Sequence, residues 1–121
     1  MSDVITELME ANLLAVFDER DPGRRAAAIA KTYAPDVKWT DEDGVSTGHE
    51  ALDAKAAALQ NGALQGLHFV KAGPVRQTGD LGYLAWEVHT PDNVAVASGF
   101  DVALIADDRI ARLWTILTDS D

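Results

Sequence analysis

Hydrophobic residues recur at helical spacing over the first third of the chain. After Ser2 or Asp3, either of which can cap a helix, apolar residues recur every three to four positions as far as Phe17, which predicts an amphipathic helix of about four turns. Asp21-Pro22 combines a cap with a proline in the first turn and begins a second, short helix, which Ala34-Pro35 is expected to close.

The remaining two thirds change from one further helix to strands. Residues 47–50, Thr-Gly-His-Glu, have the pattern of a capping box and predict a third helix that stops at Asn61-Gly62. Alternating or continuous apolar runs predict strands over 36–41, Leu67–Val75, Tyr83–His89, Val94–Ala106 and Arg109–Leu117. Helices followed by a run of strands predict an α+β fold, in which a cone-shaped, curved antiparallel sheet wraps around three helices of the N-terminal half.

Asp101 is the only charged residue between Val94 and Ile105. Because an unpaired buried charge costs several kcal/mol, it needs a partner, a solvent-filled cavity or a raised pKa. The residues that share its face of the strand are mostly small, which predicts a ligand-sized pocket beside it. The alternative is an aspartate that accepts backbone hydrogen bonds at a bulge beside Gly99.

Asp41 is the second carboxylate on an apolar face. It shares one side of the strand at 36–41 with Val37 and Trp39, so Trp39 is expected to form a wall of the pocket. The alternative is a turn residue within the acidic stretch Asp41-Glu42-Asp43-Gly44.

Composition narrows the possible partners. The 121 residues, 47% of them hydrophobic, fit a single domain over 1–121, and 10 basic against 20 acidic residues give a net charge of -10, which disfavours nucleic acid and anionic membranes. The chain has no cysteine, and it shows neither a signal peptide nor an apolar run of the ~20 residues that span a membrane. A cytoplasmic protein is expected. Metal-ligand spacings and phosphate-binding loops are missing, so we expect no metal and no cofactor.

The order of elements, the stretch Tyr33–Asp41, the helix start Gly48–Ala51 and the ending Asp107–Trp114 resemble the nuclear transport factor 2-like superfamily, in its SnoaL-like and ketosteroid-isomerase-like branch. The resemblance covers essentially the whole chain. It implies an α+β cone whose mouth holds a small apolar ligand. Members range from isomerases, polyketide cyclases, dehydratases and epoxide hydrolases to proteins without catalysis, so the fold does not choose a reaction.

The resemblance also implies roles for individual residues. Ketosteroid isomerases carry a catalytic base where Asp41 lies and a hydrogen-bond-donating aspartate where Asp101 lies. By this analogy Asp41 removes a proton and a neutral Asp101 holds the enolate oxygen. The family's helix tyrosine is missing, because residues 13–17 are all apolar, and Tyr83 could supply that hydroxyl. SnoaL-like enzymes often pair a histidine with an aspartate, which makes His68 a candidate for the pocket.

Limonene-type epoxide hydrolases have a similar outline but a different set of polar residues. They place an arginine where this chain has Gly99 and an aspartate near Thr115, so their catalytic triad is absent here. Gly99 and Thr115 are instead expected to contact a ligand.

These inferences favour a small enzyme that binds an apolar carbonyl compound, of steroid, polyketide or terpenoid type, and moves a proton as an isomerase or cyclase. The alternatives are a non-catalytic binding module with the same pocket, and a structural element whose pocket is filled by side chains. A homodimer through the open sheet face is expected, with Trp86 and Trp114 packed on the partner. The apolar residues expected on that face are Val94, Val96, Phe100, Val102 and Leu104.

Overall fold

The N-terminal half forms three helical segments in the computed structural model, which describes residues 3–118. The first segment is an α-helix, α1 (Val4–Glu10), continued by a π-helix, η1 (Ala11–Phe17). The carboxylate of Asp3 accepts the Thr6 backbone N–H at 3.1 Å, which confirms Asp3 as a cap, whereas Ser2 lies outside the described residues.

The second helix, α2 (Pro22–Thr32), begins as predicted but ends earlier than expected. The Asp21 carboxylate accepts the backbone N–H of Arg24 at 2.8 Å. At the other end Tyr33 already has extended backbone angles, and Pro35 disfavours a helical conformation for the residue before it. The chain therefore enters the first strand at Tyr33.

The third helix, α3 (His49–Asn61), is present, but the predicted capping box is not. Gly48 occupies the cap position with φ 90°, and no side chain of the described residues caps the helix. Thr47 is instead the last residue of a strand, so its hydroxyl is not placed at the helix start. Gly62 follows the last turn, as predicted.

Seven strands make up the rest of the fold among residues 3–118. They are β1 (Tyr33–Asp41), β2 (Gly44–Thr47), β3 (His68–Lys71), β4 (Arg76–Thr78), β5 (Leu81–His89), β6 (Ala95–Ala106) and β7 (Arg109–Leu117). The single strand predicted over Leu67–Val75 is wrong beyond Lys71, because Gly73 has φ 155° and Pro74 has no N–H to donate. The chain resumes pairing as β4.

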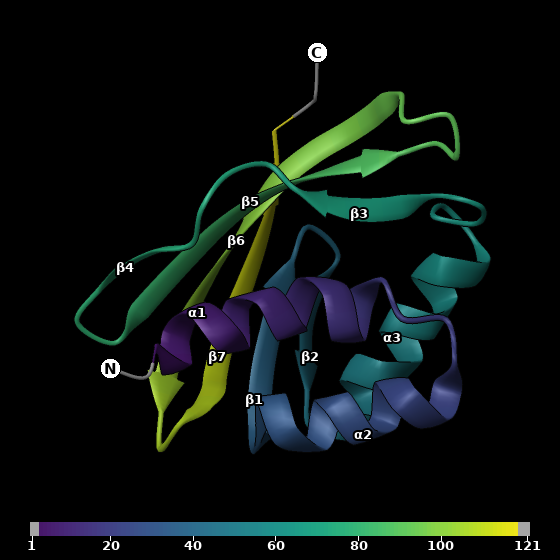
Figure 1. Ribbon diagram of the computed structural model, residues 1–121. Helices are drawn as coiled ribbons and strands as arrows, with labels where there is room; N and C mark the ends of the chain where they lie inside the picture. Colours follow the sequence, from purple (N-terminus) through teal and green to yellow (C-terminus); the bar gives the residue numbers. More distant parts are fainter. Residues whose placement is uncertain (1–2, 119–121) are drawn as a thin grey trace.

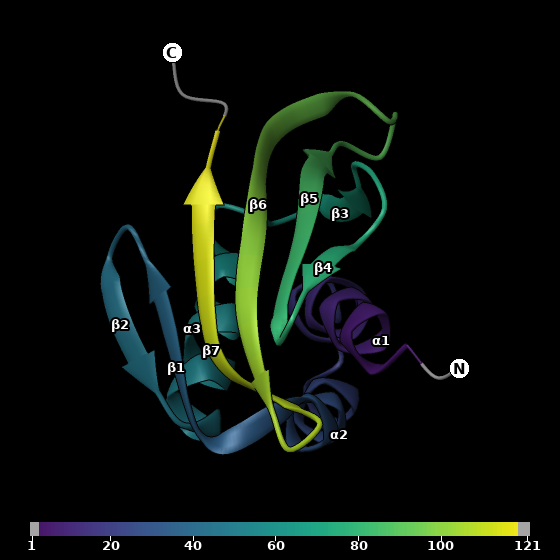
Figure 2. The same ribbon diagram turned by 90° about the vertical axis from the view of Figure 1, so that its left-hand side faces the viewer.

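The strands form one curved, open sheet in the order β2-β1-β7-β6-β5-β3, with β4 paired to β5 (Figure 2). All neighbouring pairs are antiparallel except β1 and β7, which run parallel, so the predicted antiparallel sheet needs this correction. The helices cover one face of the sheet, with α1 crossing it and α3 lying beyond β1 (Figure 1). The described part of the chain places no helix on the opposite face (Figure 2).

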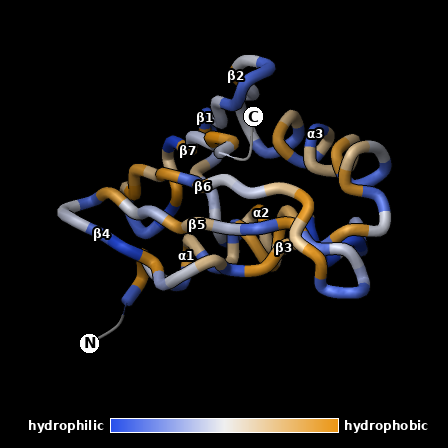
Figure 3. The backbone as a smooth tube through the Cα atoms, turned by 90° about the horizontal axis from the view of Figure 1, so that it is seen from above, coloured by the Kyte–Doolittle hydropathy of each residue, from blue (hydrophilic) through white to orange (hydrophobic). Residues whose placement is uncertain are grey.

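The core lies between the helices and the inner face of the sheet. Alternate residues of β5, Leu84, Trp86 and Val88, are buried there, whereas hydrophilic residues gather at the outlying β2 and β4 hairpins (Figure 3). On β6 the buried face carries Asp101 and Ala103, as the alternation predicts. Asp101 thus projects from the middle of the sheet into the protein interior.

Candidate functional site

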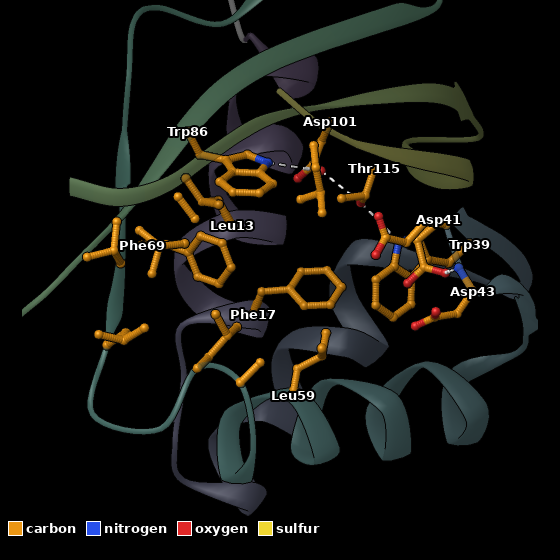
Figure 4. A pocket seen from close by; sticks show the side chains of 18 residues that line it. Leu13, Phe17, Trp39, Asp41, Asp43, Leu59, Phe69, Trp86, Asp101 and Thr115 are labelled. Atoms are coloured by element: carbon orange, nitrogen blue, oxygen red, sulfur yellow. Dashed lines mark hydrogen bonds between the residues drawn. The ribbon is translucent and has the colours of Figure 1, made fainter. Parts of the chain in front are cut away.

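A cavity of about 380 Å³ opens between the helices and one end of the sheet (Figure 4). Its walls are mainly aromatic and aliphatic side chains from η1, α3, the α3–β3 connection and the sheet. The lining residues are Leu13, Phe17, Trp39, Asp41, Glu42, Asp43, Leu59, Ala63, Leu64, Leu67, Phe69, Trp86, Val88, Val96, Ala97, Asp101, Thr115 and Leu117. The volume lies at the lower end of the range of ligand sites, and it contradicts a pocket filled by side chains.

Asp101 is the polar centre of the cavity wall. Only 3% of its surface is exposed. Oδ2 accepts a hydrogen bond from Asn12 Nδ2 at 2.8 Å, and Oδ1 accepts from Trp86 Nε1 at 3.2 Å and from Thr115 Oγ1 at 2.9 Å. These donors come from η1, β5 and β7. The alternative of an aspartate bonded to backbone groups at a bulge is wrong, because its partners among the described residues are side chains and the ladder between β5 and β6 is regular at Gly99.

Two opposing effects set the acidity of Asp101. Burial raises its pKa from 3.8 to about 6, while the three hydrogen bonds that it accepts act in the opposite direction. Burial penalises the charged form and the donors stabilise it. Both protonation states are therefore accessible near neutral pH, which is the range that suits a group that takes up and returns a proton.

A second layer of side chains fixes the direction of two of these hydrogen bonds. Tyr33 donates its hydroxyl hydrogen to Asn12 Oδ1 at 2.5 Å, and Trp39 Nε1 donates to Thr115 Oγ1 at 3.0 Å. Both outer donors belong to β1. Since Asn12 and Thr115 in turn donate to Asp101, two chains of donors converge on one carboxylate.

Asp41 lies at the end of β1 on the same cavity, in a more open position. Its Oδ2 is 2.5 Å from Lys55 Nζ on α3, and its Oδ1 accepts the backbone N–H of Asp43 at 2.9 Å. Lys55 Nζ is also 3.6 Å from Asp43 and 5.2 Å from the centre of the Trp39 ring. Asp41 is thus both a turn residue and a cavity residue, so the two interpretations of the sequence are both met. Its carboxylate forms an ion pair with Lys55.

Three of the residues expected to contact a ligand lie outside the cavity lining. A Cβ on Gly99 would be 2.7 Å from the Trp86 ring, so that ring occupies the space that the glycine leaves. His68 lies on the opposite side of β3 from the lining residue Phe69 and packs edge-on against His89, with ring centres 6.0 Å apart.

Tyr83 is the third. It alternates with the buried residues of β5 and packs against Phe100, with ring centres 5.2 Å apart, on the outer face of the sheet. Its hydroxyl therefore cannot replace the missing helix tyrosine. The same alternation places Trp86 inside the cavity, which corrects its expected position on a dimer partner. Trp39 and Thr115 do line the cavity.

The polar residues that the sequence analysis missed have weak local signals. Asn12 stands between Leu8 and Val16 at helical spacing, and this polar residue on an apolar stripe was a usable sign. Tyr33 and Lys55 carried none, because their contacts come from elements distant in sequence.

Comparison with known proteins assigns the chain to a family. The sequence profile of the SnoaL-like domain matches residues 11–113. The chain belongs to the SnoaL-like domain family. No curated protein matches it in sequence. Within residues 3–118 no helix is both long and apolar enough to cross a membrane.

Solved structures with the same fold include other SnoaL-like proteins. A candidate isomerase of the SnoaL-like family from Agrobacterium tumefaciens has a TM-score of 0.87 at 24% identity, covering 95% of this chain and 97% of that one. A candidate SnoaL-like polyketide cyclase from Jannaschia sp. CCS1 has a TM-score of 0.71 at 17% identity, over 97% and 90%. A protein with a ketosteroid-isomerase-like fold from Catenulispora acidiphila, solved with trimethylamine, has a TM-score of 0.70 at 16% identity, over 94% and 87%. At these identities the likeness concerns the fold.

Proposed function

We propose that this SnoaL-like protein is an isomerase or cyclase that moves a proton next to a carbonyl group of a small apolar substrate. The observation that carries the proposal is the buried Asp101 carboxylate, which lies on an apolar cavity and is faced by three hydrogen-bond donors. A carboxylate with a pKa raised to about 6 is matched to proton transfer near neutral pH.

The direction of these hydrogen bonds favours Asp101 as the base. Each protein partner offers it a hydrogen, which stabilises the ionised form that a base requires. This reverses the division of roles implied by the resemblance. Asp41, paired with Lys55, then belongs to the polar mouth of the cavity and is the alternative base.

In the proposed reaction the carbon–hydrogen bond next to the carbonyl breaks. Its proton passes to an Asp101 oxygen and its electron pair forms the enolate. An isomerase returns the proton to another carbon. A cyclase lets the enolate carbon attack a second carbonyl of the same molecule, and the oxygen of that carbonyl takes up the proton.

The cavity favours a substrate that stabilises its own enolate. Among the lining side chains of the described residues, the three that carry a donor hydrogen are Trp39, Trp86 and Thr115, and each donates to another protein atom. A developing oxyanion would therefore find no dedicated side-chain donor in the wall. A carbonyl compound whose negative charge spreads over a second carbonyl or an aromatic ring, as in polyketide-type molecules, needs the least help. The SnoaL-like neighbour described as a candidate polyketide cyclase supports this choice over steroid- or terpenoid-like compounds.

Proton exchange tests the proposal without knowledge of the natural substrate. We expect the protein to accelerate the exchange of the benzylic α-protons of 2-tetralone in D2O, followed by NMR. Asp101→Asn should remove a factor of about 10²–10⁴ from this rate, while Asp41→Asn should retain most of it. Loss of exchange in Asp41→Asn alone would instead make Asp41 the base.

A non-catalytic binding module is the second candidate function. The engaged donors of the cavity wall favour it. If 2-tetralone raises the melting temperature of the protein but exchange proceeds at the solvent rate in the wild type and both variants, the protein binds and does not catalyse.

We also propose that the protein forms a homodimer through the open sheet face. Leu104 and Ile116 are 37% and 47% exposed there, which favours a covering partner. Sedimentation should show a dimer at micromolar concentration, and Leu104→Glu should shift it to monomer. A wild-type monomer would refute this proposal.

A further inference from the structure

We infer that Tyr33 is a positioning residue, which fixes the orientation of the Asn12 amide and thereby holds Asp101 as a hydrogen-bond acceptor. The inference deepens the proposed function, because it rests on Asp101 as the base. Tyr33 itself lies behind Asn12, away from the cavity lining. It would act on the carboxylate through another side chain.

The geometry of Tyr33 leaves one arrangement of hydrogens. The residue is 1% exposed, and within residues 3–118 the hydrogen-bond partner of its hydroxyl is Asn12 Oδ1. A buried hydroxyl hydrogen without an acceptor is costly, so the oxygen end of the Asn12 amide must face Tyr33. The nitrogen end then faces Asp101 Oδ2, at 2.8 Å.

The orientation of the amide matters because its two ends have opposite effects on a carboxyl group. The N–H end stabilises the ionised form of Asp101, whereas the oxygen end would accept a hydrogen from the neutral form. Without the hydrogen bond from Tyr33, the Asn12 amide could rotate by half a turn when Asp101 takes up a proton. Tyr33 opposes that rotation, because its hydroxyl hydrogen would lose its acceptor.

The other groups around Asp101 do not supply this control. Trp86 and Thr115, from β5 and β7, donate to Oδ1 and carry no titrating group. Tyr33 is itself titratable, but burial and the charge of Asp101 raise its pKa well above 10.0, so it stays a donor. The remaining charged groups that face the cavity lie at its mouth and are Asp41, Glu42, Asp43 and the Lys55 that pairs with Asp41.

The test is a titration of Asp101 in the absence of substrate, read from its side-chain carboxyl ¹³C signal, which Asp101→Asn identifies by its loss. Tyr33→Phe should raise the pKa of Asp101 by about 1 or more, a tenfold or larger gain in proton affinity, as expected for the weakening of a hydrogen bond to a charged group. Tyr83→Phe removes the same hydroxyl from the outer face of the sheet and should leave the titration unchanged. An unchanged pKa in Tyr33→Phe would overturn the inference.

A second comparison shows whether Tyr33 acts through Asn12. Asn12→Leu should raise the pKa of Asp101 by itself, and Tyr33→Phe should then add nothing. An equal effect of Tyr33→Phe in both backgrounds would mean a direct action of the hydroxyl and would overturn the inference. Should Asn12→Leu not fold, the wild-type side-chain amide signal of Asn12 replaces it as the readout. That signal should follow the Asp101 titration, and a signal that does not move contradicts the proposed coupling.

These outcomes are separate from those of the proposed function. A shifted Asp101 titration with unaltered proton exchange in Asp101→Asn would refute the base and keep the positioning role. Loss of exchange in Asp101→Asn with no shift in Tyr33→Phe would do the reverse. Where both hold, the pH profile of exchange in Tyr33→Phe moves to higher pH with the titration.

Discussion

Replacement of Asp101 by asparagine should change how the stability of the protein depends on pH. The folded-state pKa of about 6 lies above the ordinary value of 3.8, so Asp101 favours folding below about pH 4. That contribution is lost as the pH rises through 6. The difference of about 2 between the two pKa values corresponds to about 3 kcal/mol at neutral pH. Since Asp101 is 3% exposed, solvent screening reduces this value little.

The assay is urea unfolding, followed by tryptophan fluorescence, for wild type and Asp101→Asn between pH 3.5 and 8. Asparagine has nearly the shape of a neutral aspartate, and the other acidic residues contribute equally to both proteins. The free energy of unfolding of the variant minus that of the wild type should therefore increase by about 3 kcal/mol from the acid to the alkaline end. If the difference in unfolding free energy does not depend on pH, or decreases as the pH rises, the pKa of Asp101 is not raised. Its suitability as a base near neutral pH would then be refuted as well.

Three further predictions concern packing and ion pairs. Gly99→Ala should destabilise the fold by ~2 kcal/mol or more, because the new Cβ would be 2.5 Å from the Ile116 carbonyl oxygen. The control is Gly23→Ala in the first turn of α2, where the nearest contact of the new Cβ is 3.4 Å. In the same urea assay the control should be neutral or stabilising by up to ~1 kcal/mol. Arg25→Met should cost about 3 kcal/mol, because it breaks a 5% exposed arginine away from Asp53 and Gln60; a loss below ~1 kcal/mol would contradict this. Glu10→Gln, which removes an exposed pair with Lys71, should change the unfolding free energy by less than ~1 kcal/mol.

Most of the fold could be predicted from the sequence because its elements have strong local periodicity. The boundaries of β7 and the C-terminal end of α3 follow from turn residues and alternation. The parallel pairing of β1 with β7 could not be predicted in this way, because it joins the first strand to the last and no local pattern records that contact. The split between β3 and β4 was missed because Gly73 and Pro74 interrupt a run that otherwise reads as one strand.

The candidate site was predictable in its centre and not in its surroundings. Asp101 stood out because a charge in an apolar strand is rare, and its inward direction follows from alternation. Alternation along a strand gives the face of a residue but does not show whether a side chain of a neighbouring strand covers it. Gly99 shares the face of Asp101 but is covered by Trp86, and Tyr33 reaches the site only because α2 ends before it. Donors that converge from η1, β1, β5 and β7 are a property of the tertiary structure.

The energetics of Asp101 argue for a functional role of the polar cluster. A structural residue at this position would not need a charge, because burying one costs stability. At neutral pH the ionised Asp101 instead lowers the stability of the folded protein by about 3 kcal/mol relative to its neutral form. Buried polar side chains surround it, among them Asn12 and Tyr33, both at most 1% exposed. A buried charge that faces a ligand-sized cavity and lowers the stability of the fold is expected where activity requires that charge. If Asp101→Asn is more stable than the wild type at neutral pH but no longer accelerates proton exchange, the charge lowers stability in return for activity. If the variant is more stable and exchange is unchanged, the charge has no catalytic role.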